Sequence, residues 1–163
     1  SWTHDREMAN LRSAEQLIAL LIDCVSKNGN MLLNVGPNAR GQLDPRILQR
    51  LREIGDWMSL HERAIRDCGA APKEFTAPPN SALTYNAERR RLYLHLFAWP
   101  AQAFHIDFGD KVKYAQFLHD GSEVEMAPAM NIEGGITTYV GCALQLPMHK
   151  PAVAVPVIEF FLE

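Results

Sequence analysis

The sequence predicts an α+β fold in which a helix–strand–helix unit precedes an antiparallel β-sandwich. Before residue 66, apolar side chains recur at helical spacing on both sides of one short apolar run. After residue 66, they alternate almost throughout with a period of two, which is typical of strands. Alanine, proline and glycine are frequent over 66–82, so we expect a boundary there, with one segment at 1–66 and another at 67–163.

The first helix is expected over 13–27. Ser13 and Gln16 have the spacing of a capping box, in which each side chain bonds the other residue's backbone amide. Asn28 and Gly29 supply the stop. The next run, 30–35, is almost continuously apolar, which predicts a strand buried on both faces of a parallel sheet.

A second helix is expected to begin at Asp44 and Pro45. Aspartate is a favoured N-cap, and proline fits the first helical position because its missing amide has no partner there. Helix, strand and helix together correspond to a slice of an α/β layer rather than a finished domain.

Short strand-like runs follow from residue 82, separated by turn signals. Pro156 falls within the last of them, which predicts an edge strand or a bulge at that point. This spacing of short strands predicts an antiparallel sandwich or barrel. The expected strands are 82–86, 92–99, 102–108, 112–118, 123–126, 136–140, 143–146 and 152–162.

Composition narrows the function classes. The 163 residues carry 16 Lys and Arg against 19 Asp and Glu, so the acidic balance gives no reason to expect nucleic-acid binding. No apolar run approaches the ~20 residues of a membrane span, so no membrane partner is expected. Three widely spaced cysteines without a CxxC pair suit neither a disulfide framework nor zinc, and buried reduced thiols are expected.

The chain shows no complete catalytic motif. It has no Gly-rich phosphate loop and no GxSxG, and its six histidines are scattered, so we expect no cofactor and no metal site. The more promising region is the end of the 30–35 run, because α/β barrels place their sites at the carboxyl ends of strands. Trp2 is a candidate for the same rim, where its ring would stack on a sugar; the alternative is a packing aromatic at a domain seam.

Residues 23–37 read D-C-V-S-K-N-G-N-M-L-L-N-V-G-P. This run resembles the pattern D-V-V-S-K-x-G-N-L-L-L-N-x-G-P of family 29 glycoside hydrolases, the α-L-fucosidases. Other stretches also resemble that family: Ser1-Trp2, the helix around residues 15–18, residues 50–58 and residues 91–100. The resemblance therefore covers essentially the whole chain.

The resemblance implies a (β/α)8-type barrel followed by a β-sandwich. Residues 1–66 would be the C-terminal segment of the catalytic barrel, and 67–163 the C-terminal sandwich. The family's nucleophilic aspartate and acid/base glutamate lie on earlier strands, so no catalytic residue is assigned here. The family carries out retaining hydrolysis of α-L-fucosides without a metal. The resemblance thus implies that a fucosylated glycan is the partner of the complete enzyme, and that this chain is inactive alone.

One site residue follows from the resemblance, together with two departures from the family pattern. Trp2 matches an aromatic that lines the fucose pocket, so it is the expected substrate-binding residue. Thr3-His4 stands where the family has Gly-Tyr, which would alter the pocket rim. Residues 62–66, E-R-A-I-R, replace G-E-A-I-Y at the end of the last helix, which would alter the junction between barrel and sandwich.

Two other functions remain open, together with one physical expectation. The sandwich would serve as a non-catalytic carbohydrate-binding or interaction module if Trp99 were an exposed platform rather than a core residue. Thr3-His4 would also suit a related hydrolase for another sugar. Because the 30–35 strand would lack barrel neighbours, its open apolar edge predicts self-association of the chain, or a rearrangement of residues 1–60 against the sandwich.

Overall fold

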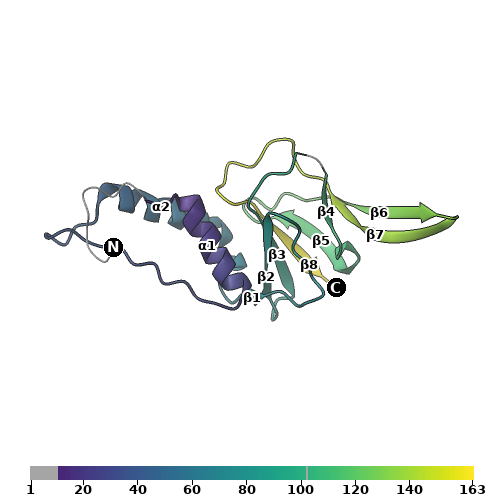
Figure 1. Cartoon of the computed structure of the whole chain (residues 1–163), viewed down its shortest axis with the longest axis horizontal. Coiled ribbons are helices and arrows are strands. Elements are labelled where there is room, and N and C mark those ends of the chain that lie inside the picture. The colour runs from purple at the N-terminus through teal and green to yellow at the C-terminus, as the bar shows by residue number, and fades with distance from the viewer. Residues whose placement is uncertain (1–10, 102) are drawn as a thin grey trace.

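A computed structural model describes residues 11–101 and 103–163 of the chain. Two helices and a long connecting segment lie at one end of the molecule, and two antiparallel sheets lie at the other (Figure 1). The predicted α+β class is therefore confirmed.

Both predicted helices form, with the predicted caps. Helix α1 spans Ala14–Ser26, and both bonds of its capping box are present: Gln16 N donates to Ser13 Oγ at 3.1 Å, and Ser13 N donates to Gln16 Oε1 at 3.0 Å. Helix α2 spans Pro45–His61, and the Asp44 carboxylate accepts from Arg46 N at 2.8 Å. These local bonds satisfy backbone amides that a helix start leaves without intrahelical partners.

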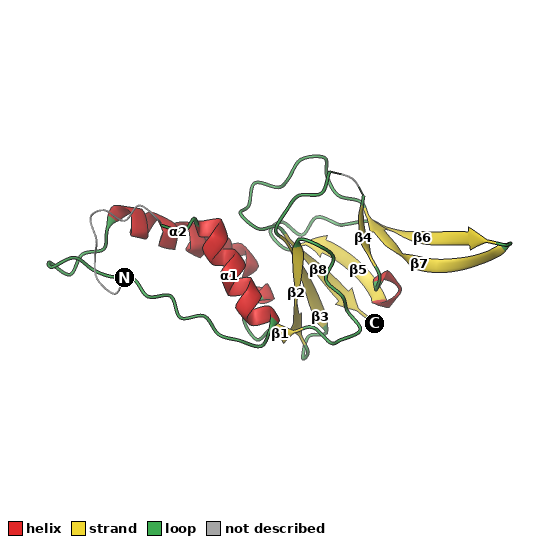
Figure 2. Cartoon of the chain, viewed as in Figure 1, coloured by secondary structure: helices red, strands yellow, loops and turns green. Residues whose placement is uncertain are grey.

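The strand predicted over 30–35 is wrong. The segment 29–43 runs between α1 and α2 without a hydrogen-bonded strand beside it (Figure 2). Leu32 is 94% exposed. A parallel strand exists only where neighbouring strands take up its amides and carbonyls, and the described part of the chain provides no such neighbour. The apolar pattern indicates that these residues are suited to burial in a sheet, but the described residues supply no neighbouring strand for them.

The strands build two sheets, and every pairing is antiparallel. The larger sheet has the order β1-β2-β3-β8-β5 and the smaller β4-β7-β6. The hairpin of β6 and β7 projects from the body (Figure 1). The strands are β1 Gly69–Ala70, β2 Ser81–Asn86, β3 Arg91–Leu96, β4 Phe104–Ile106, β5 Val112–Phe117, β6 Met126–Glu133, β7 Ile136–Leu144 and β8 Val157–Leu162, and the short helices are η1 Glu62–Ala64 and η2 Gly109–Lys111.

The larger sheet has a core on each face. Leu92, Leu94 and Leu96 of β3 pack with residues of both sheets, including Leu144 of β7, and form the sandwich core. The alternate residue Tyr93 belongs to a second cluster with Ile18 of α1 and Trp57 of α2. Strand side chains alternate between faces, so β3 serves both cores at once.

Three predicted strand features change in detail. The runs 136–140 and 143–146 join as one strand, β7, which passes through Gly141, where a Cβ would lie 2.6 Å from the Ile106 carbonyl oxygen. Residues 123–126 give an isolated bridge and the start of β6. The edge or bulge expected at Pro156 is wrong: β8 begins after it and lies centrally between β3 and β5. The Pro156 carbonyl still accepts from Leu96 N at 3.0 Å.

Candidate functional site

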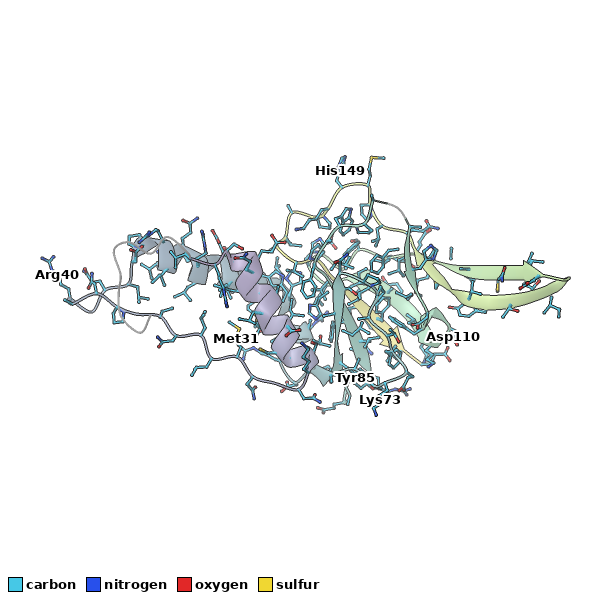
Figure 3. All side chains as sticks on the ribbon, viewed as in Figure 1. Met31, Arg40, Lys73, Tyr85, Asp110 and His149 are labelled. Carbon is cyan, nitrogen blue, oxygen red and sulfur yellow. The ribbon has the colours of Figure 1, made fainter. Side chains whose placement is uncertain are left out.

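The structure describes one of the two regions predicted to form the site, residues 34–37, and not the other. Trp2, the expected substrate-binding residue, lies outside the described residues, as does the departure Thr3-His4. Residues 34–37, the expected site at a strand end, instead belong to the unpaired segment, where only Gly36 is buried. In Figure 3, Arg40 stands at the far tip of this segment, away from both sheets.

Polar side chains gather instead where α2 meets the larger sheet. Trp57, in the last turns of α2, donates from Nε1 to the Val155 carbonyl oxygen at 2.8 Å. His61, one turn later, stacks on the Trp57 ring with 4.7 Å between the ring centroids. Both side chains are buried. His61 Nδ1 lies 2.8 Å from the Trp57 carbonyl oxygen, which can only accept, so Nδ1 carries the proton.

A second buried histidine continues this junction from the sheet. The Thr84 hydroxyl donates its one proton to the Ala64 carbonyl oxygen at 2.7 Å. His95 Nε2 lies 2.8 Å from the same hydroxyl oxygen, so Nε2 carries the proton and donates. The remaining ring atoms, His61 Nε2 and His95 Nδ1, are buried without a partner in the described chain.

Burial holds both rings neutral. It lowers the pKa of His61 to about 4, against a smaller opposing effect of its bond to the Trp57 carbonyl. It lowers the pKa of His95 to about 3, and the neighbouring His61 adds to that shift. Both side chains are fully buried, so no substrate reaches them. These histidines tie the helices to the sheet, and they do not form an acid–base pair open to solvent.

An ion pair between a half-exposed arginine and a buried glutamate crosses the same junction. Arg63 Nη2, in η1, lies 3.0 Å from Glu159 Oε1 of β8, and Gln116 Nε2 donates to that oxygen at 2.8 Å. Burial and the Glu159 charge raise the pKa of Tyr93 beside them. The sequence signals for this pair were the E-R-A-I-R departure and a single glutamate within the apolar run V-I-E-F-F-L. Sequence reasoning located the junction but missed the pair.

Trp99 is half-buried and packs against the sandwich core. Its ring stacks on Phe117 with 6.3 Å between centroids, and Nε1 donates to the Pro147 carbonyl oxygen at 3.2 Å. This geometry corresponds to the core interpretation of Trp99.

The cysteines and acidic residues form no metal centre in the described chain. No group of three or more histidine, cysteine, aspartate or glutamate side chains is arranged to hold an ion there. All three cysteines are free, and burial together with Asp67 raises the pKa of the Cys68 thiol to about 12. Nor is any helix of the described residues long and apolar enough to cross a bilayer.

Comparison with known proteins connects the chain to one family. The family model described as "Alpha-L-fucosidase" matches residues 1–63. Tissue α-L-fucosidase of Bos taurus is 34% identical over 102 residues, and α-L-fucosidase of Dictyostelium discoideum is 28% identical over 159. Among solved structures, α-L-fucosidase isoenzyme 1 from Paenibacillus thiaminolyticus is 32% identical and superposes with a TM-score of 0.86 over 99% of this chain.

The chain spans only part of each relative. The alignment covers 61% of this chain but 21% of the bovine protein, and 95% of this chain but 33% of the Dictyostelium protein. For the Paenibacillus structure the covered share is 37%. The likeness thus extends over both the helical part and the sheets of this chain, and over a minor part of the relatives.

Proposed function

Since this chain belongs to the α-L-fucosidase family, we propose that it forms the C-terminal part of a hydrolase acting on α-L-fucosides. Its helices would complete a catalytic barrel, and its sandwich would support them. In this proposal the segments 1–66 and 67–163 correspond to the end of the barrel and to the sandwich. The partner of the complete enzyme would be a fucosylated glycan.

One observation carries the proposal: the Paenibacillus fucosidase superposes on 99% of this chain while 63% of its own length has no counterpart here, since the covered share is 37%. The exposed segment 29–43 gives independent support to the proposal. The second part of the family pattern, G-N-M-L-L-N-V-G-P, lies in that segment, which pairs with no strand among the described residues. An apolar run that pairs with nothing is typical of a barrel strand whose neighbours come from elsewhere.

The chain contributes binding and support, and it contributes no chemical step. A retaining glycosidase needs a carboxylate nucleophile and an acid/base carboxyl group facing one sugar. Neither is assigned to a residue of this chain, whereas Trp2 would line the sugar pocket. The junction of α2 with the sheet would hold the last barrel helix in register with the sandwich. The isolated chain would therefore be inactive.

Hydrolysis of an aryl α-L-fucoside tests this proposal. We expect no turnover by the purified chain above that of buffer, and turnover by a longer protein that joins this chain to a preceding barrel segment. In the longer protein, Trp2→Ala should raise KM, with Trp99→Ala as the matched control. Turnover by the isolated chain that persists through purification contradicts the inactive-fragment proposal.

A further inference from the structure

An arginine-lined cavity opens beside the junction, on the face of the larger sheet that the helices leave partly uncovered. It encloses about 170 Å3. Arg63, Arg89 and Arg91 line it together with Tyr93, Glu159 and Phe161. We call it the arginine pocket. It lies where the segments 1–66 and 67–163 meet, with Arg63 from the first segment and the other lining residues from the second.

Arg91 is held in place, and most of its hydrogen-bonding capacity is unused. Its guanidinium carbon lies 3.7 Å from the centroid of the Phe161 ring. Its Nη1 donates to the carbonyl oxygens of Arg89 at 2.8 Å and Arg90 at 3.4 Å. The N–H groups on Nε and Nη2 have no partner among the described residues. A guanidinium fixed by stacking loses little side-chain freedom when it binds a ligand.

The positive charge of the pocket is only partly compensated within its lining. Glu159 is the one carboxylate there, and its Oε1 already accepts from Arg63 and Gln116. No ion pair engages Arg89 or Arg91 within the described structure. The hydroxyl of Tyr93 is buried beside Glu159 and has no hydrogen-bond partner among the described residues.

We propose that the arginine pocket binds a tetrahedral oxyanion, a sulfate or phosphate group that is either free or carried as an ester on a larger ligand. Guanidinium groups pair with such anions through parallel N–H···O bonds. The net charge of the chain is −3, so no general positive field attracts anions, and the affinity would be local to the pocket. Because Arg91 covers the Phe161 ring, the pocket suits an anion better than the apolar face of a neutral sugar.

Calorimetric titration of the full chain with sodium sulfate and sodium phosphate tests the site, at an ionic strength held constant with sodium chloride. We expect one binding event per chain. Arg91→Gln should weaken it by about tenfold or more, which corresponds to losing charge-assisted hydrogen bonds. Arg89→Gln should weaken it by about threefold. Arg52→Gln, an exposed change on α2 outside the lining, should leave the affinity unchanged.

Two further measurements make the outcome decisive. Circular dichroism shows whether the Arg91→Gln protein folds. Because Arg89 is exposed, the Arg89→Gln protein reports on the site even if Arg91→Gln does not fold. A monosaccharide sulfate and a monosaccharide phosphate, compared with the free ions, distinguish an ester-binding site from a free-ion site. No binding of either ion at concentrations up to about 20 mM overturns the proposal. Equal affinity in the parent, Arg89→Gln and Arg91→Gln proteins also overturns it.

Discussion

The junction of α2 with the larger sheet and the segment 29–43 are both rich in apolar residues, yet they differ in almost every physical respect. At the junction, Trp57 is 4% exposed, and its Nε1 donates a hydrogen bond to the Val155 carbonyl oxygen. Along the segment, Leu32 is almost fully exposed and no strand pairs with the backbone. The first region packs against other described residues of this chain, and the second pairs with no strand among them.

The comparison shows that the region expected to stabilise the fold is not the region that carries most of the family pattern. The junction draws on α2, η1, β2, β3 and β8, which the chain itself supplies, so its contacts should dominate the free energy of unfolding. The segment carries the second part of the long motif but has little burial, so its side chains should matter for association more than for folding. Four predictions test this contrast.

Trp57→Ala should have the largest effect. It removes a buried ring, its stacking on His61 and its hydrogen bond to Val155. Losses of this kind cost about 3–5 kcal/mol, measurable by urea denaturation. Leu60→Ala, an exposed position on the same helix, is the control and should cost less than about 0.5 kcal/mol. Similar losses in both variants would mean that the junction is not the stabilising region.

Acidification should weaken the junction next. His61 and His95 have folded-state pKa values of about 4 and about 3, below the ordinary 6.5. The unfolded chain therefore takes up protons first, so stability is full above pH 6.5 and is lost as pH falls toward 4. Each histidine contributes at most ~1.4 kcal/mol per pH unit, so about 3 kcal/mol should be lost between pH 6.5 and 5.

Urea midpoints across that pH range measure the effect. The exposed His105 provides a matched control, and His105→Gln should leave the profile unchanged. His95→Gln should flatten the profile if it folds, and His61→Gln provides a second variant. A stability that does not change between pH 6.5 and 5 would contradict the assignment of both rings as buried and neutral.

Arg63→Met should cost about 2 kcal/mol, because it leaves the buried Glu159 carboxylate with Gln116 as its one partner. Arg66→Met breaks the exposed pair with Glu62 and should cost less than about 0.5 kcal/mol. If Glu159→Gln is introduced first, the loss from Arg63→Met should shrink. An undiminished loss would show that Arg63 stabilises the junction through packing rather than charge.

Leu32→Asp should have the smallest effect on stability, below about 0.5 kcal/mol, because the side chain is already exposed. It should instead reduce the self-association predicted for the parent chain, as measured by light scattering and by a dye that binds apolar surface. Met148→Asp, at a similarly exposed position in another loop, is the control. A parent chain that is a monodisperse monomer with no dye signal would contradict the association.

Local signals predicted the elements that local bonds create. Ser13 and Asp44 cap their helices as expected, because an N-cap needs only backbone amides two or three residues away. The antiparallel strands followed from alternation and turns. The strand over 30–35 failed because a strand depends on neighbours that its own residues do not specify.

The candidate site was less accessible from the sequence. Trp2 remains a prediction outside the described residues, and it rests on a family resemblance. The pairing of Arg63 with Glu159 joins residues 96 positions apart, so no local pattern predicts it. Residues 62–66 marked the place only as a departure from a motif.

By itself, the sequence determined the helix caps, the change from helical to alternating periodicity near residue 66, and the family relationship, because each is written in neighbouring residues. Only the tertiary structure decided that His61 and His95 are buried and neutral, that Glu159 is paired, and that Arg89 and Arg91 share a pocket. Burial and charge pairing depend on which distant segments come together, and that is a property of the folded chain.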